Sequence, residues 1–428
     1  MRFTAFHAAA LAVPLVAAHG HGDYHSPRIM GQETNDIGKL RNRPIMDARA
    51  ARIVPHKNLL QARQGGAAGR CGPDHGNASC DEGYCCSPAG WCGKGPDFCM
   101  APDCLFNFGP GCDANQIPSG GSTGKVSRPQ LGNQIYGGEG IYACTVPNKI
   151  AITYDDGPFI YTNEVLDQFA KYGAKATFFV TGININKGAI DDESKEWPSI
   201  IRRMDAEGHQ VASHTWSHQD LSAITQEQRY DQMIRNEMAI SNILEKFPTY
   251  MRPPYSSCTP QSGCQQDLAD LGYVVSYFNL DTDDYNNVTP EKIQNAKDRV
   301  SGVIDPSNPE QDSFQTIAHD IHQQTAQNLT AYMLEKMTEK GYKLVTLGEC
   351  LGEPKENWYR PATLRVATSS VFVAPKSEPT PTAPDNGSSM PSAAMATPTG
   401  TTLDGSCGSD NGLTCFGKRF SSDITRRS

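Results

Sequence analysis

The chain has 428 residues, a formal net charge of −9 at pH 7 and 14 cysteines. The acidic balance argues against nucleic acid as a partner, because proteins that bind a phosphate backbone present basic surface to it. The dense clustering of cysteines in one segment favours an oxidising, extracellular compartment.

The first 18 residues have the pattern of a secretory signal peptide. Arg2 precedes an apolar stretch over residues 8–18 that ends in small residues, as expected before a cleavage site. The stretch is too short to span a bilayer. We therefore expect a secreted protein, extracellular or in the cell wall, with no transmembrane segment. Residues 19–70 lack sustained periodicity and are predicted to be a variable linker.

A cysteine-rich segment follows. So dense a cysteine spacing predicts a disulfide scaffold, since so short a segment cannot bury an adequate core. Eight cysteines allow about 105 pairings, and the sequence alone does not choose among them. The eight are Cys71, Cys80, Cys85, Cys86, Cys92, Cys99, Cys104 and Cys112.

The run Cys-Cys-Ser-Pro-Ala-Gly-Trp-Cys-Gly at residues 85–93 resembles the hevein-type chitin-binding module. The resemblance places a small hevein-like domain at residues 71–112 and implies the pairs Cys71–Cys86, Cys80–Cys92, Cys85–Cys99 and Cys104–Cys112. It also implies a sugar site made of Ser87, Trp91 and Phe98. Ala89 stands where the family often has an aromatic residue, which predicts weak binding. The alternative is a structural knot in which Trp91 packs internally.

Residues 113–139 are predicted to be a linker, and residues 118–124 read Pro-Ser-Gly-Gly-Ser-Thr-Gly, which is typical of a flexible tether. The apolar run at residues 150–152 then leads into Thr-Tyr-Asp-Asp-Gly-Pro at 153–158. This pattern indicates a buried strand that ends at a sharp turn with two adjacent carboxylates. Two adjacent acids are costly to hold unless a cation or a proton separates their roles.

A second motif, Ser-His-Thr-Trp-Ser-His at residues 213–218, offers partners for that cation. The i, i+4 spacing of His214 and His218 predicts that both imidazoles lie on one face of a helical turn. One carboxylate with two imidazoles is a common catalytic zinc set. Either motif alone is more often a solvated turn or a satisfied histidine; together they indicate a site.

Three more pieces follow in order: Arg-Pro-Pro-Tyr at 252–255, Asp-Thr-Asp-Asp-Tyr at 281–285 and Ile-Ala-His-Asp at 317–320. With them, residues 142 to about 352 resemble the polysaccharide deacetylases, carbohydrate esterase family four. The resemblance implies a distorted (β/α) barrel, and we assign the domain to residues 140–352. A helical stretch at 163–172, a strand at 176–180 and an amphipathic stretch at 225–247 support this α/β class.

The resemblance implies roles for individual residues. Asp155 resembles the general base, held by Arg252, and His319 the general acid. Asp284 would orient His319, with Asp281 as the alternative, and the backbone amide of Tyr255 would stabilise an oxyanion. Tyr285, where the family usually has tryptophan, and Ile317 would line the acetyl pocket. The implied metal ligands are Asp156, His214 and His218.

The implied reaction hydrolyses N-acetyl groups, releasing acetate from chitin to leave chitosan. A divalent metal makes water acidic enough to serve as a nucleophile. Zn²⁺ is expected, and Co²⁺ is possible because the ligand set also accepts other divalent ions. Asp155 would take the proton of the attacking water, and His319 would protonate the leaving amine.

Outside the module, we expect Cys144–Cys350 to join the ends of the catalytic segment and Cys258–Cys264 to clip a loop. Residues 353–428 are predicted to be a disordered Ser/Thr/Pro-rich tail, in which Cys407 and Cys415 resemble a truncated hevein opening. Asparagines in Asn-x-Ser/Thr patterns are potential glycan acceptors: Asn77, Asn287, Asn328 and Asn386.

The expected partner is chitin or another N-acetylglucosamine polymer, and a monomer is expected. Two alternatives remain. One keeps the chemistry and changes the glycan to peptidoglycan or xylan. The other is a chitin-coating lectin with an inactive barrel, which the complete set of acids and histidines disfavours.

Overall fold

A parallel β-sheet surrounded by helices forms the larger part of the fold in the computed structural model, which describes residues 69–362. The strands follow the order β12-β3-β11-β4-β5-β6-β8-β9, and β10 pairs with β11. No pairing joins β9 to β10 within residues 69–362, so the sheet is an open, distorted (β/α) barrel, which confirms the predicted class. Its strands are β3 (Lys149–Ala151), β4 (Thr153–Asp155), β5 (Thr177–Val180), β6 (Gln210–Ser213), β8 (Tyr250–Met251), β9 (Val274–Val275), β10 (Leu280–Asp281), β11 (Phe314–His319) and β12 (Lys343–Val345).

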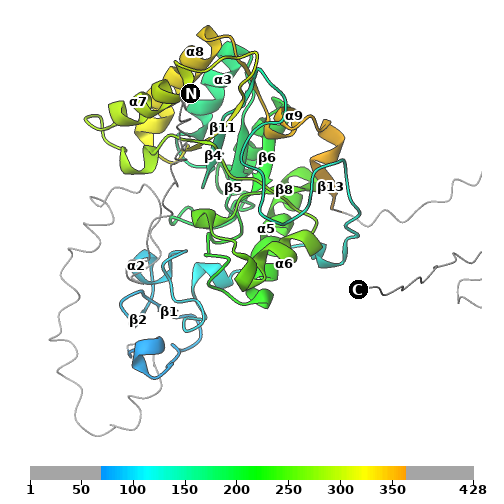
Figure 1. Ribbon diagram of the computed structural model, residues 1–428. Coiled ribbons are helices and arrows are strands. Elements are labelled where there is room, and N and C mark those ends of the chain that lie inside the picture. Colours follow the sequence, from blue (N-terminus) through cyan, green and yellow to red (C-terminus); the bar gives the residue numbers. More distant parts are fainter. Residues whose placement is uncertain (1–68, 363–428) are drawn as a thin grey trace, which may run out of the picture. The chain divides into compact units, whose positions relative to one another are not determined.

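The helices turn apolar side chains toward these strands. Val165, Leu166 and Phe169 of α3 are buried in the same core cluster as Tyr154 of β4 and Phe178 of β5. Figure 1 shows α3, α7 and α8 grouped on one side of the strands, and α5 with α6 on another. The helices of this domain are α3 (Thr162–Tyr172), α4 (Trp197–Ala206), α5 (Gln226–Leu244), α6 (Cys264–Asp270), α7 (Ile293–Ile304), α8 (Thr330–Glu339) and α9 (Leu347–Cys350).

Helix α5 begins at a capping box. The Thr225 side chain accepts from the Gln228 amide, and the Gln228 side chain accepts from the Thr225 amide, which satisfies two amides that the helix leaves unpaired. The helix ends before Glu245, whose φ of 58° is left-handed. The amphipathic stretch predicted over residues 225–247 is therefore too long at its C-terminal end, where β7 (Lys246–Pro248) takes over.

The predicted tail starts too early. Residues 353–362 are part of the fold, because β13 (Tyr359–Pro361) pairs antiparallel with β7. Trp358 is 2 % exposed, and its indole Nε1 donates to the Glu353 carbonyl at 3.1 Å. Burial of so large a ring fixes the segment to the domain. The Cys407/Cys415 segment and the predicted signal peptide lie outside the described residues.

The cysteine-rich segment is built on disulfides around very short elements: β1 (Cys85–Cys86), β2 (Cys92–Gly93), α2 (Pro96–Cys99) and η3 (Pro73–His75). Strands β1 and β2 pair antiparallel. Both core clusters of the segment consist of cysteines with aromatic side chains packed on them, and Leu105 also packs on one of the two. Its four disulfides and the two of the barrel are the expected pairs: Cys71–Cys86, Cys80–Cys92, Cys85–Cys99, Cys104–Cys112, Cys144–Cys350 and Cys258–Cys264.

The segment expected to be a flexible tether instead packs on the barrel. Arg128 donates from Nη1 and Nη2 to the two carboxylate oxygens of Glu237 in α5, both at 2.8 Å. Tyr273 donates to the same carboxylate at 2.7 Å, and the Thr123 hydroxyl also donates to it. Glu237 is fully buried, so these bonds hold residues 123–128 against α5. The composition of residues 118–124 gave no sign of this distant acceptor.

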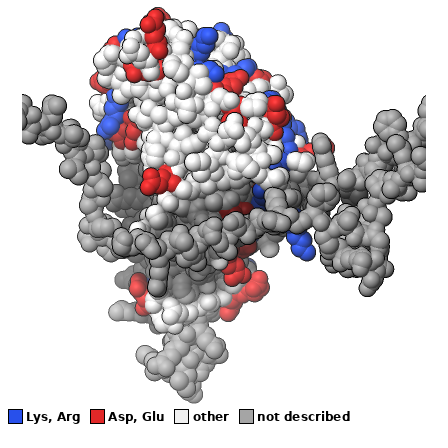
Figure 2. Space-filling view, turned by 45° about the vertical axis from the view of Figure 1, so that its right-hand side comes forward, with Lys and Arg blue, Asp and Glu red and all other residues white. Residues whose placement is uncertain are grey.

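The remaining short helices are η4 (Asp113–Asn115), η5 (Thr123–Lys125), η6 (Pro254–Ser256), η7 (Pro260–Ser262), η8 (Asp284–Asn286), the π-helical turn η9 (Thr325–Leu329) and η10 (Lys355–Asn357). None of the helices in residues 69–362 has the length and apolar character needed to cross a membrane. Figure 2 shows Lys/Arg and Asp/Glu interspersed at the margins of a broad area that carries neither.

Candidate active site

Five loops at the carboxyl ends of the strands bring the predicted site residues together. Asp155 ends β4 and is the register partner of His319, which ends β11. His214 follows β6, and Arg252 follows β8. Ser213 of β6 pairs with Met251 of β8, so the residues after these strands are also neighbours. Carboxyl ends of parallel strands meet at one rim, which is where (β/α) barrels carry their chemistry.

Asp156, His214 and His218 form a compact set of ligand atoms. One carboxylate oxygen and one ring nitrogen from each histidine lie within 4.8 Å of one another, and all three residues are buried. His218 Nε2 lies 3.2 Å from Asp156 Oδ1, and His214 Nε2 lies 3.7 Å from it. Both Asp156 carboxylate oxygens lack a hydrogen-bond partner in the described residues. Buried acceptors of this kind fit a bound cation, because leaving them unpaired is costly.

The two histidines do not share a helical turn, so that prediction was wrong. They lie in a loop after β6, in which Thr215 and His218 have φ values of 71° and 56°. His214 Nδ1 donates to the Arg252 carbonyl at 2.7 Å, which turns Nε2 toward Asp156. Such outer hydrogen bonds fix the tautomer of a metal ligand. Burial lowers the pKa of both histidines, and the neutral imidazole is the form that binds a metal.

Arg252 is buried, and each of its three guanidinium nitrogens donates a hydrogen bond. Its Nη1 donates to Asp155 Oδ1 at 2.8 Å and to Thr153 Oγ1 at 2.7 Å. Its other nitrogens donate to the carbonyls of Ser276 and Tyr277. The guanidinium therefore has one fixed position, from which it holds one oxygen of Asp155. The second oxygen, Oδ2, lies 3.8 Å from His214 Nε2.

The two adjacent aspartates have opposite pKa shifts. Burial raises the pKa of Asp155 to about 6, although Arg252 and His319 oppose the shift. Burial also disfavours the charge on Asp156, but His218 and His214 outweigh it and lower its pKa. Carboxyls whose environments separate their pKa values in this way are suited to different tasks.

His319 and Asp284 form a buried pair. His319 Nδ1 donates to Asp284 Oδ1 at 2.8 Å, and the His319 amide donates to Oδ2 at 2.7 Å. The Thr325 hydroxyl donates to the same Oδ2. Burial opposes the charge on His319, but Asp284 overcomes it and raises the pKa of His319 to about 9. The imidazolium is thus the form present near neutral pH.

Tyr285 and Ile317 lie beside His319. The rings of Tyr285 and His319 meet edge to face with centroids 5.6 Å apart. Ile317 is two residues before His319 on β11, hence on the same side of the strand, and it is buried. The Tyr285 hydroxyl donates to Asp281 Oδ2 at 3.0 Å. Asp281 thus holds Tyr285, whereas Asp284 contacts His319.

Tyr255 packs against the metal-ligand set. Its ring centroid lies 4.7 Å from that of His218, and its backbone has a left-handed φ of 58°. A non-glycine residue in this conformation is strained and persists only where its surroundings hold it. Here the residue follows Pro253 and Pro254, which restrict the chain before it.

Lys187 and Asp320 are site residues that the sequence analysis missed. The Lys187 ammonium donates to the carbonyls of Asp156 at 2.7 Å and Gly157 at 2.9 Å, and to Thr181 Oγ1 at 3.0 Å. Asp320 accepts from the Thr162 hydroxyl at 2.5 Å, and its carboxylate would overlap any Cβ at Gly157. Lys187 therefore holds the backbone of the Asp156 turn, and Asp320 packs directly against that turn. The only available signal was the position of Asp320 directly after His319.

The residues of the proposed sugar site in the cysteine-rich segment already contact other residues of the protein. The Arg70 guanidinium lies 4.1 Å from the centre of the Trp91 ring, and Ser87 Oγ accepts from the Trp91 amide at 3.2 Å. Phe98 packs on the cluster of Cys85, Cys104 and Cys112. Trp91 remains partly exposed.

Comparison with known proteins relates the chain to deacetylases. Residues 143–276 match the family model described as polysaccharide deacetylase, and residues 70–108 match chitin recognition protein. A chitin deacetylase of Colletotrichum lindemuthianum is 40 % identical over 232 residues, 54 % of this chain and 91 % of that protein. A probable peptidoglycan-N-acetylglucosamine deacetylase of Arthroderma benhamiae is 38 % identical over 239 residues, 56 % of this chain and 52 % of that protein.

Among solved structures, a chitin deacetylase from Colletotrichum lindemuthianum has 41 % sequence identity and a TM-score of 0.49, covering 53 % of this chain and 97 % of that one. The fold and the rim define the chain as a barrel enzyme of the deacetylase class. It belongs to the polysaccharide deacetylase family and also carries a chitin-recognition domain.

Proposed function

We propose that the protein is a secreted, metal-dependent deacetylase that hydrolyses the N-acetyl groups of chitin, leaving chitosan and acetate. The observation that carries this proposal is the buried set of Asp156, His214 and His218 beside two differently tuned groups, Asp155 and His319. An inactive barrel would be expected to lack at least one of these residues. The relative of which the chain covers 91 % is itself named a chitin deacetylase.

Asp156, His214 and His218 would hold the metal. When bound, a zinc ion polarises the amide carbonyl and makes water a stronger acid. Two imidazoles and one carboxylate suit zinc, and cobalt is also accepted by such a set. The neutral state of both histidines and the orphaned Asp156 oxygens fit this assignment.

Asp155 serves as the general base. Arg252 fixes its Oδ1, so Oδ2 is the oxygen available to take a proton from the attacking water. The water oxygen bonds to the acetamide carbon while its proton moves to Asp155. The raised pKa of Asp155, about 6, places this base close to neutral pH. The Tyr255 amide is assigned to stabilising the oxyanion that forms.

His319 then protonates the departing amine as the carbon–nitrogen bond breaks, and acetate is released. Its charge is maintained by Asp284, to which Nδ1 donates, so the Nε2 proton is the one to be transferred. Tyr285 and Ile317 would enclose the acetyl methyl. The Tyr285 hydroxyl already donates to Asp281, so it leaves the pocket wall without an unpaired polar group.

The chitin-recognition domain would direct the enzyme to N-acetylglucosamine polymer through Ser87, Trp91 and Phe98. Each of these three side chains also contacts a neighbouring residue of the protein. Six disulfides in residues 69–362 and the relatives fit an extracellular location. Asn77 and Asn328 are exposed and accessible to glycosylation. Asn287 is buried with its amide bonded to the Asp283 carbonyl, so it is a poor acceptor.

Acetate release from soluble chitin oligomers tests the proposal. The purified protein is stripped with a chelator and restored with zinc or cobalt, beside Asp155→Asn and the exposed control Asp81→Asn. We expect metal-dependent acetate that Asp155→Asn reduces at least about a hundredfold and Asp81→Asn leaves unchanged. Acetate from peptidoglycan fragments alone would instead favour the activity named for the Arthroderma relative. If no acetylated glycan gave acetate, the protein would instead be a chitin-binding protein without deacetylase activity.

A further inference from the structure

The carboxylate that orients His319 is held by a second residue, Thr325. Asp284 Oδ1 accepts from His319 Nδ1 at 2.8 Å, and Oδ2 accepts from the His319 amide at 2.7 Å. Thr325 Oγ1 also donates to Oδ2, at 2.8 Å. Asp284 and Thr325 are fully buried, and His319 is 2 % exposed. Thr325 therefore adds a donor to this carboxylate from outside His319, in a place that solvent does not reach.

An unusual helical turn places Thr325. It begins the π-helical turn η9, in which the Thr330 amide donates to the Thr325 carbonyl; turns of this kind are rare and occur frequently at functional sites. The Thr330 hydroxyl donates to the same carbonyl at 2.9 Å. Because its single proton is then in use, the Tyr154 hydroxyl, 2.8 Å from Thr330 Oγ1, is the donor of their bond. Tyr154 directly precedes Asp155 in β4, so these bonds connect the strand of the base to the partner of the acid.

The two donors on Oδ2 determine how the carboxylate faces His319. The terminal torsion of an aspartate has a broad energy well, so a carboxylate needs contacts on both oxygens to keep one orientation. With the Thr325 hydroxyl and the His319 amide on Oδ2, Oδ1 is left facing the imidazole. Without the hydroxyl, Oδ2 would be held by the amide of His319, the same residue whose ring the carboxylate orients.

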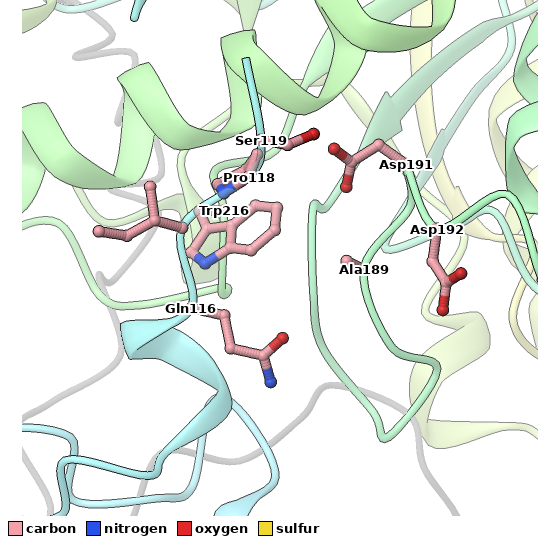
Figure 3. Close-up of a pocket in the computed structure, with 8 residues that line it drawn as sticks. Gln116, Pro118, Ser119, Ala189, Asp191, Asp192 and Trp216 are labelled. Atoms are coloured by element: carbon pink, nitrogen blue, oxygen red, sulfur yellow. The ribbon is translucent and has the colours of Figure 1, made fainter. Parts of the chain in front are cut away.

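Burial makes the Thr325 hydroxyl hard to replace. Figure 3 shows the opposite situation, in which Ser119 lies with Asp191 and Asp192 around a small pocket. Ser119 is exposed, so water can take over a hydrogen bond there. Thr325 and Asp284 have no exposed surface. A bond lost between them leaves a charged oxygen with one donor fewer, which is costly.

We propose that Thr325 is a positioning residue for protonation of the leaving amine, because its hydroxyl fixes the Asp284 carboxylate that in turn aims the His319 imidazole. This inference rests on the proposed function, in which His319 is the general acid. Thr325 is buried and does not reach the substrate. Its loss should therefore lower kcat and leave KM unchanged, as for an interaction that matters only in the transition state.

The geometry is tested by amide hydrogen exchange at His319 in the full chain, because this amide donates to the oxygen that Thr325 also holds. Thr325→Val removes the hydroxyl and keeps nearly the same shape. We expect exchange about tenfold faster, whereas Thr325→Ser, which keeps the hydroxyl, should match the wild type. Thr249→Val is the control, since it removes another buried hydroxyl, one that donates to the Asn357 carbonyl. It should leave exchange at His319 unchanged.

The consequence for the reaction is tested by kinetics on soluble chitin oligomers. Thr325→Val should lower kcat about tenfold with KM unchanged, and Thr325→Ser should retain most of kcat. If Thr325 acts through Asp284, adding Thr325→Val to Asp284→Asn should cost little more, because changes within one network are not additive. Thr249→Val should keep the kcat and KM of the wild type.

Unchanged exchange at His319 or unchanged kcat in Thr325→Val would overturn the proposal. A further tenfold loss of kcat on top of Asp284→Asn would do the same, because Thr325 would then act by another route. Thr325→Ala, which also lacks the hydroxyl, replaces Thr325→Val if that variant does not fold. Absence of acetate from the wild-type enzyme would overturn the proposed function, whereas the exchange result does not depend on activity, so the two failures can be told apart.

Discussion

Single side chains at the rim determine which group carries a proton. Asp155 and Asp156 are adjacent in the sequence, yet one faces Arg252 and the other two histidines. Because burial amplifies each charge interaction, neighbouring residues acquire different proton affinities. The same reasoning applies to Asp281 and Asp284, of which one bonds a tyrosine and the other a histidine.

Asp284→Asn should lower the alkaline limit of activity. The pKa of His319 is raised to about 9, so the acid stays protonated at neutral pH and activity should fall as the pH rises through about 9. Without the carboxylate, burial dominates and the pKa of His319 drops. The alkaline limb of the pH profile, where activity falls, therefore moves toward lower pH. A pH profile of kcat/KM measures the shift. Asp281→Asn, three residues away, should leave the limb in place; equal shifts in both variants would contradict the assignment.

Lys187→Met should weaken metal binding although Lys187 is not a ligand. Its ammonium holds the carbonyls of Asp156 and Gly157, and Asp156 has a left-handed φ of 74°. Loss of such an outer contact costs about 10–100-fold in metal affinity or activity. Competition with a chromophoric chelator measures zinc affinity directly. Lys175→Met removes a comparable lysine–carbonyl bond, to Glu207, and should leave zinc affinity unchanged.

Two strands and the order of the site motifs could be predicted from the sequence, because short apolar runs mark residues 150–152 and 176–180. Residues 150–155, 176–180 and 314–319 lie on neighbouring strands of the sheet. The conformation after β6 could not be predicted, because the spacing of His214 and His218 fits a helix equally well. Only the left-handed backbone at Thr215 and His218 distinguishes the observed loop from a helical turn. Lys187 was missed since a lysine in a polar loop is usually solvated.

Of the two disulfides in the barrel domain, the one that joins the ends of the domain should contribute more to the free energy of unfolding. Cys144 and Cys350 are 206 residues apart, against six for Cys258 and Cys264. Closing a longer loop restricts the unfolded chain more. Replacing both Cys144 and Cys350 with alanine should lower the free energy of unfolding by about 2–5 kcal/mol. Denaturant unfolding measures the loss, and the Cys258/Cys264 double variant should lose less. The reverse order would contradict the entropic argument.

In the molecule as a whole, the segment between the two domains is part of the fold. Its anchor, Glu237, accepts from residues 123, 128 and 273, and it lies on a helix more than a hundred residues further along the chain. Composition is a local property, so a stretch rich in glycine and serine gave no sign of a partner at that distance.

Glu237→Ala should therefore release the segment as well as destabilise the protein. The variant leaves Arg128, whose side chain is 9 % exposed, without its carboxylate, and breaking a buried pair in this way costs about 3–5 kcal/mol. Limited proteolysis should then cut within residues 113–139 more readily than in the wild type. Glu227→Ala is the control, because Glu227 is exposed on the same helix. If Glu237→Ala were as resistant as the control, the anchor of the segment would lie elsewhere.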